Sequence, residues 1–121
     1  MAEILIADDQ PTMLRLLMIT LPAEHEVSQA TDGEKALRVA EEVVPDLVLL
    51  EINMPGKDGL EVLRQIRQNP RLASAKAIVI SARIEEATRL LALQIGAIDY
   101  VTKPFNLLAL VERVNAALGP N

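Results

Sequence analysis

Several polar side chains of this chain follow short apolar runs, and their types are those that handle phosphate and a divalent cation. They are Asp8 and Asp9 after residues 4–7, Glu51 and Asn53 after 47–50, Ser81 after 77–80, and Lys103 after 99–102. Phosphoryl transfer requires a carboxylate nucleophile, a divalent cation and a positive side chain that neutralises the transferred group. Mg²⁺ prefers oxygen ligands such as carboxylates and carbonyls. These residues could therefore act together if the fold brings them to one place.

The segments that must position these residues alternate between short apolar runs and amphipathic stretches. Strands are predicted at 4–7, 26–30, 47–50, 77–80 and 99–102. Helices are predicted at 11–21, 33–43, 60–67 after a turn at Gly59, 85–95, and from the cap Asn106 to about 118. Such alternation predicts a parallel sheet with right-handed crossovers. The strands are apolar throughout rather than alternating, which indicates that both sheet faces are covered. In a sheet of order 2-1-3-4-5, all the polar residues would meet beyond the carboxyl ends of the strands.

Local signals mark the ends of the predicted helices. Pro11 lies in the first turn of the first helix, and Pro22 ends it. Asp32 is expected to cap the second helix and Asn106 the last. Gly96 stops the helix that begins near 85.

Composition narrows the classes of function. The 121 residues fit a single domain over 1–121, with 119–121 as a plain terminus or the start of a linker. The chain has no cysteine, and His25 is its only histidine, which excludes disulfides, thiol catalysis and metal sites built on cysteine or clustered histidine. A net charge of −5 argues against direct nucleic-acid binding. No membrane span or signal peptide is apparent, so we expect a cytoplasmic protein without a membrane partner.

Four segments resemble the receiver domain of two-component response regulators in order and spacing. They are Asp8-Asp9, Glu51-Ile52-Asn53-Met54-Pro55 with Asp58-Gly59, Ser81-Ala82, and the run from Gly96 to Phe105. The resemblance covers nearly the whole chain. It implies a flavodoxin-like fold, phosphorelay signalling rather than enzymatic activity, and a histidine kinase or phosphotransfer protein as partner. One pocket residue departs from the family pattern, because Glu51 occupies the position of the phosphoacceptor aspartate.

The resemblance also implies a role for each pocket residue. Asp9 would bind Mg²⁺ directly, Asp8 largely through water, Asn53 through its backbone carbonyl, and Glu51 through the oxygen that aspartate normally supplies. Lys103 and Ser81 would contact the phosphoryl group. Tyr100 would turn inward when Ser81 moves. Because Glu51 replaces aspartate, we expect the affinity for Mg²⁺ to be weakened.

Three interpretations of Glu51 compete. In the first, it mimics a phosphoryl group, since one more carbon–carbon bond carries its carboxylate about 1.5 Å further towards Lys103 and Ser81. In the second, the chain is a pseudo-receiver that works as an interaction module without phosphorylation. In the third, Glu51 pairs with Lys103, leaves Ser81 in place and locks the inactive form. The otherwise intact pocket favours an altered acceptor over a long-abandoned site.

Each residue also has a simpler interpretation when it is taken alone. Asp8 and Asp9 could cap the first helix, and Ser81 could cap the helix near 85. Lys103 could belong to an ordinary turn, Tyr100 could be a half-exposed aromatic, and Glu51 could be a solvated loop carboxylate. A different class of protein, a small flavin-type electron carrier, would need a phosphate loop after the first strand. The acidic residues found there disfavour it.

Three apolar residues suggest a surface for a partner. Leu91, Ile98 and Leu108 lie where relatives usually carry polar side chains, on the fourth helix, before the fifth strand and on the fifth helix. In the family this face communicates the switch, so we expect an effector or a second copy of the chain to bind here. The competing interpretation is that Leu91 and Leu108 widen the core stripes of their helices.

Overall fold

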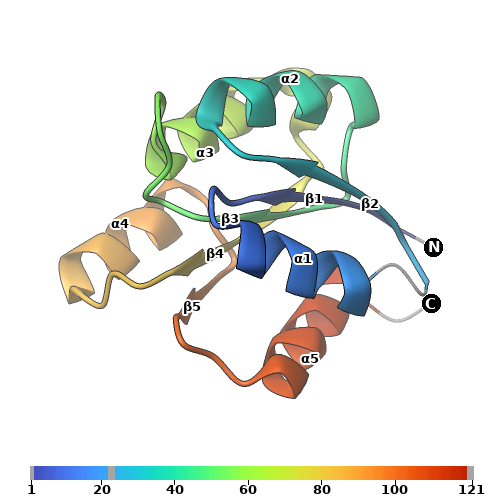
Figure 1. Ribbon diagram of the computed structural model, residues 1–121. Coiled ribbons are helices and arrows are strands. Elements are labelled where there is room, and N and C mark those ends of the chain that lie inside the picture. The colour runs from blue at the N-terminus through green and yellow to red at the C-terminus, as the bar shows by residue number, and fades with distance from the viewer. Residues whose placement is uncertain (1, 22–23, 120–121) are drawn as a thin grey trace.

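The computed structural model describes residues 2–21 and 24–119, which form a parallel sheet between two layers of helices (Figure 1). The strands pair in the order β2-β1-β3-β4-β5. In chain order the elements are β1 (Glu3–Ala7), α1 (Pro11–Thr20), β2 (Glu26–Ala30), α2 (Gly33–Val43), β3 (Leu47–Leu50), α3 (Gly59–Gln68), the 3₁₀ turn η1 (Pro70–Leu72), β4 (Lys76–Ser81), α4 (Glu86–Ile95), β5 (Asp99–Thr102) and α5 (Leu107–Leu118). The predicted flavodoxin-like architecture, with five parallel strands and five helices, is confirmed.

The differences from the predicted elements are small. β1 and β4 are slightly longer than predicted, and α4 begins one residue later because Glu85 is its N-cap. The turn η1 was not predicted; it follows Asn69, whose side chain accepts a hydrogen bond from the backbone N–H of Arg71. Pro22, predicted to end α1, lies outside the described residues, as do 120 and 121 of the segment interpreted as a terminus or linker.

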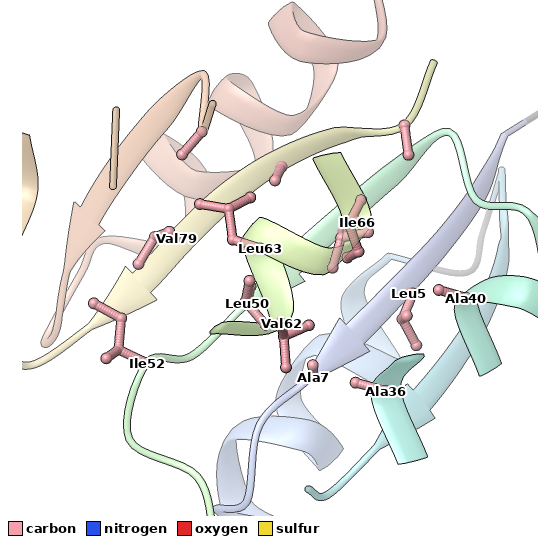
Figure 2. Packing of buried hydrophobic residues seen from close by; sticks show 14 of the residues in the cluster. Leu5, Ala7, Ala36, Ala40, Leu50, Ile52, Val62, Leu63, Ile66 and Val79 are labelled. Carbon is pink, nitrogen blue, oxygen red and sulfur yellow. The ribbon is translucent and has the colours of Figure 1, made fainter. Parts of the chain in front are cut away.

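Both faces of the sheet are buried, which explains why its strands are apolar throughout. The helices α2, α3 and α4 cover one face, and α1 and α5 cover the other (Figure 1). Successive strand residues point to opposite faces, so Leu50 belongs to the first core and Leu49 to the second, and both are almost fully buried. Figure 2 shows the first core, in which Val62 and Ile66 of α3 pack over the strand residues.

Side-chain caps begin three of the helices, and two of these caps, Asp32 and Asn106, were predicted. Asp32, Asp58 and Asn106 each accept a hydrogen bond from a backbone N–H in the first turn of α2, α3 and α5. α1 and α4 are different, because their N-caps Gln10 and Glu85 make no such bond. None of the helices in the described part of the chain is long and apolar enough to cross a membrane.

Gly59 brings the start of α3 against the end of β3. A Cβ added at this glycine would lie 2.2 Å from the backbone oxygen of Glu51 and 2.7 Å from Cα of Ile52. The backbone N–H of Gly59 also donates to the carbonyl of Ile52 at 2.8 Å. The absence of a side chain therefore lets α3 support the backbone that carries Glu51.

Candidate functional site

The residues that directly follow β1, β3 and β5 meet at the ammonium of Lys103, beyond the carboxyl ends of the strands. Nζ of Lys103 lies 2.9 Å from Oδ2 of Asp8 and 2.6 Å from Oε1 of Glu51. The three side chains are only 10%, 4% and 6% exposed, in the order Lys103, Asp8 and Glu51. Of the residues predicted to converge at this edge, these three are in direct contact.

A fourth residue, Gln10, was missed by the sequence analysis. Its Oε1 accepts a hydrogen bond from Nζ of Lys103 at 2.8 Å. Its backbone N–H donates to Oδ1 of Asp8 at 2.9 Å. The interpretation of Asp8 as a helix cap is wrong, because Gln10 is the N-cap of α1 and the other oxygen of Asp8 accepts from Lys103. The sequence signal that could have revealed Gln10 is a long amide directly before Pro11, at a position where short Ser, Thr, Asn or Asp side chains are preferred.

Glu51 is a buried, fully hydrogen-bonded carboxylate. Oε1 contacts Lys103, while Oε2 accepts hydrogen bonds from the backbone N–H groups of Ile52 at 2.8 Å and Asn53 at 3.1 Å. The interpretation of Glu51 as a solvated loop residue is therefore wrong. Charge-assisted hydrogen bonds of this kind are the strong ones in proteins, so the carboxylate is held in one orientation.

Burial and pairing act in opposite directions on the ionisable groups. Burial raises the pKa of Asp8 above its ordinary value of 3.8, although the Gln10 N–H and Lys103 both act to lower it. Burial lowers the pKa of Lys103, but its hydrogen bonds to Glu51 and Asp8, together with their charges, outweigh that effect and raise the pKa above 10.5. Lys103 therefore stays protonated at neutral pH.

Ser81 and Tyr100 are joined through the backbone of Arg83. Oγ of Ser81, which is fully buried, accepts a hydrogen bond from the Arg83 N–H at 3.2 Å. The hydroxyl of Tyr100 donates to the Arg83 carbonyl at 2.8 Å. Tyr100 is 8% exposed, and burial raises the pKa of its phenol. Ser81 is not the cap of α4, because Glu85 holds that position, and Tyr100 is not half-exposed, so both simpler interpretations are wrong.

The carboxylates as they lie do not fit a Mg²⁺ ion. Within residues 2–21 and 24–119, no group of three or more Asp, Glu, His or Cys side chains is arranged to hold a metal. Lys103 stands between Asp8 and Glu51, while Asp9 and Asn53 are exposed. A cation would have to compete with the ammonium for the same oxygens.

The predicted partner surface is exposed. Leu91, Ile98 and Leu108 are 38%, 49% and 76% accessible to solvent. The idea that Leu91 and Leu108 widen the core stripes of their helices is therefore wrong. Ile84 and Leu90, at 76% and 51% exposed, add to the exposed apolar residues on and just before α4 and were not singled out from the sequence.

Comparison with known proteins identifies relatives along nearly the whole chain. The family model for the response regulator receiver domain matches residues 4–115. The alkaline phosphatase synthesis transcriptional regulatory protein PhoP of Bacillus subtilis is 38% identical over 117 residues, which are 96% of this chain and 48% of PhoP. The transcriptional regulatory protein KdpE of Mycobacterium tuberculosis is 39% identical over 122 residues, covering 100% of this chain and 53% of KdpE. The chain thus spans about half the length of these curated relatives.

Solved structures lead to the same family. A DNA-binding response regulator of the LuxR family from Staphylococcus aureus has a TM-score of 0.88 and 29% identity, with 98% of this chain and 100% of that chain covered. A chain in the CheX–CheY–BeF3–Mg²⁺ complex of Borrelia burgdorferi has a TM-score of 0.89 and 28% identity, with 98% and 90% covered. These matches set aside the interpretation as a flavin-type electron carrier. The chain belongs to the response-regulator receiver domains of two-component signalling.

Proposed function

We propose that this receiver domain carries Glu51 at the position of the phosphoacceptor and that the carboxylate acts as a partial phosphoryl mimic. The observation that carries this proposal is the buried 2.6 Å contact between Oε1 of Glu51 and Nζ of Lys103. A fixed negative charge on this lysine is what a phosphorylated aspartate would supply. The domain would then regulate its partner through the exposed face formed by Leu91, Ile98 and Leu108 on α4, before β5 and on α5.

The mimic is incomplete for reasons of charge. A phosphoryl group brings about −1.5 to −2 charges and three strong acceptor oxygens. Glu51 brings one charge and two oxygens, and one of these is already bound to two backbone N–H groups. Only Oε1 is left to act on the switch, and it contacts Lys103.

The two switch residues support a partial shift. Tyr100 is buried and bonded to the Arg83 carbonyl, which is the inward position expected when the switch is engaged. Oγ of Ser81 accepts from the Arg83 N–H, and the hydrogen bonds of Glu51 come from Lys103 and two backbone N–H groups rather than from the Ser81 hydroxyl. Converting a 1:99 equilibrium to 99:1 takes about 5.5 kcal/mol of differential binding. One carboxylate oxygen on one lysine is too little for that.

The position of Ser81 also favours a second candidate, a phosphorylation-independent interaction module. In that case the Glu51–Lys103 pair locks one conformation, and the chain never responds to a phosphodonor. The two candidates differ in one respect: a mimic holds the partner-binding face towards the active conformation, whereas a lock leaves it inactive.

The pocket residues and the family also suggest a partner and a cofactor for the domain. We propose a histidine kinase or phosphotransfer protein as the relay partner. Asp8, Asp9, Glu51 and the Asn53 carbonyl would hold Mg²⁺ only weakly and only after a rearrangement, since Lys103 already contacts two of the carboxylates. The relatives named above are transcriptional regulators about twice as long as this chain. Contact with nucleic acid would belong to such additional segments, because this chain has a net charge of −5. A cytoplasmic location and a role without enzymatic activity complete the proposal.

The experiment that tests the mimic measures the NMR signal of the Ile98 methyl groups. Three samples are compared: the chain as given, Glu51→Gln, which keeps the size and removes the charge, and Glu51→Asp treated with beryllofluoride and Mg²⁺. We expect the chain as given to lie between the other two on a line of chemical shifts. If its signals coincide with those of Glu51→Gln, the carboxylate does not act on the switch and the interaction module is correct.

A further inference from the structure

The ammonium of Lys103 has all its hydrogen bonds satisfied by protein atoms. A protonated lysine carries three N–H donors. In this pocket three acceptors surround it: Oδ2 of Asp8 at 2.9 Å, Oε1 of Gln10 at 2.8 Å and Oε1 of Glu51 at 2.6 Å. Two of these acceptors are carboxylates and the third is a neutral amide. No donor remains for a phosphoryl oxygen unless one of the three is displaced.

Gln10 contacts Lys103 instead of capping the helix that it precedes. It is the N-cap of α1, where short Ser, Thr, Asn or Asp side chains are preferred because they bond the first-turn N–H groups. The Gln10 side chain makes no such bond and instead turns to Lys103. Its backbone N–H donates to Asp8, which in turn accepts from Lys103, so the contacts form a closed ring. A cap lost at a site of this kind points to a functional constraint.

A neutral acceptor suits this position because the pocket is already negative. Asp8 and Glu51 carry two negative charges against the single positive charge of Lys103. A third carboxylate in contact would add like-charge repulsion, whereas an amide adds a hydrogen bond without charge. All three bonds are charge-assisted by the ammonium, but the two carboxylates add an attraction between opposite charges that the neutral amide lacks. Of the three acceptors, Gln10 is therefore the one most easily displaced.

We infer that Gln10 is a positioning residue for Lys103: its amide oxygen holds the ammonium between Asp8 and Glu51 and is the contact that gives way when another acceptor needs that N–H. The inference rests on the proposed function, because it concerns the lysine that Glu51 contacts. Gln10 lies outside the four segments that resemble the receiver family, so those segments give it no role in the pocket.

The test is the rate at which the ammonium protons of Lys103 exchange with water, measured by ¹H–¹⁵N NMR on the whole chain. Gln10→Met keeps the length of the side chain and removes the acceptor, and we expect exchange to become roughly ten- to a hundredfold faster, as expected for the loss of a hydrogen bond to a charged group. Gln10→Glu restores an acceptor and should return the exchange to the slow rate. Gln68→Met, at an exposed glutamine at the end of α3, is the matched control and should change nothing.

The outcomes separate this inference from the proposed function. Unchanged exchange in Gln10→Met, or equally fast exchange in Gln10→Met and Gln10→Glu, overturns the positioning role, because the acceptor would then be irrelevant. The Ile98 methyl shifts of the chain as given test the mimic and do not depend on Gln10. Either idea can therefore fail while the other stands.

Discussion

Replacing Lys103 by methionine should destabilise this protein more than the removal of any surface charge. Methionine preserves most of the side-chain volume and removes the ammonium. Asp8 and Glu51 would be left as neighbouring carboxylates, each less than a tenth exposed, without their counter-charge. Breaking a buried ion pair by removing one partner costs about 3–5 kcal/mol, because the remaining charge is buried and unpaired.

The expected change in melting temperature follows from the size of the chain. An unfolding entropy of about 2.1 cal/mol/K per residue gives roughly 0.25 kcal/mol per kelvin for a chain of this length. A loss of about 3–5 kcal/mol therefore lowers Tm by roughly 12–20 °C. Thermal unfolding followed by circular dichroism measures this directly, and urea unfolding gives the free energy independently.

Lys57→Met is the matched control. Lys57 also pairs with a carboxylate, that of Glu34, but at 3.5 Å and with side chains 26% and 71% exposed. Such surface pairs contribute about 1 kcal/mol or less, so Lys57→Met should shift Tm by only a few degrees. A second control is the double variant Lys103→Met with Glu51→Gln, which removes one of the two carboxylates and should recover part of the loss.

The pH dependence has a defined sign. Burial already raises the pKa of Asp8 above 3.8, and removal of Lys103 takes away charge that lowers it. The stability deficit of Lys103→Met should therefore be large at neutral pH and should shrink as the pH falls through the folded-state pKa of Asp8, where protonation removes the unpaired charge. Equal losses in Lys103→Met and Lys57→Met at neutral pH, or a deficit that does not depend on pH, would refute the reasoning.

Other measurements test the pocket and its surroundings. Incubation with acetyl phosphate and Mg²⁺ should add no phosphate to the chain by intact mass, whereas Glu51→Asp should gain one phosphate per chain; a stoichiometric adduct on the unaltered chain would contradict the role of Glu51. At a Mg²⁺ concentration a hundred times the dissociation constant of Glu51→Asp, Mg²⁺ should stabilise that variant by about 2.7 kcal/mol. The chain as given should be stabilised much less at the same concentration. Melting curves recorded with Mg²⁺ and with chelator measure both effects. Gly59→Ala should cost about 1–3 kcal/mol in urea unfolding because its methyl group would meet the backbone of Glu51, 2.2 Å away; a neutral result would show that α3 can move aside. Sedimentation should show that any self-association is lost in Ile98→Asp and retained in Ile19→Asp, since Ile19 is an exposed isoleucine outside the proposed face, on α1.

Much of the fold could be predicted because single residues carry strong local signals. The run Leu47–Leu50 is buried on both faces, and no amphipathic helix has that pattern. Asp32 and Asn106 cap their helices as predicted, since their short side chains have few other ways to satisfy the first-turn N–H groups. The turn η1 was missed because its three residues have no periodicity to read.

The site was less predictable because its contacts join distant parts of the chain. The position of Lys103 at a strand end indicated convergence, but the choice of Gln10 as its third acceptor is made across 93 residues. Tyr100 shows the same limit: a lone tyrosine in a strand can point inward or outward, and the inward position depends on the Arg83 carbonyl, which lies 17 residues away in the sequence. Exposure of Leu108 likewise depends on how α5 rotates against the sheet, which an apolar helix sequence does not fix.

The contacts of Lys103 also bear on how the chain folds while it is being synthesised. Lys103 lies 95 residues after Asp8 and 52 after Glu51. Domains emerge from the ribosome N-terminal end first, so the two carboxylates are synthesised well before their counter-charge. A nascent chain that ends before β5 can pair β1 with β3, but it brings Asp8 and Glu51 to the same edge with no ammonium between them. The repulsion between these carboxylates opposes early closure of this edge, and release of the last segment removes it.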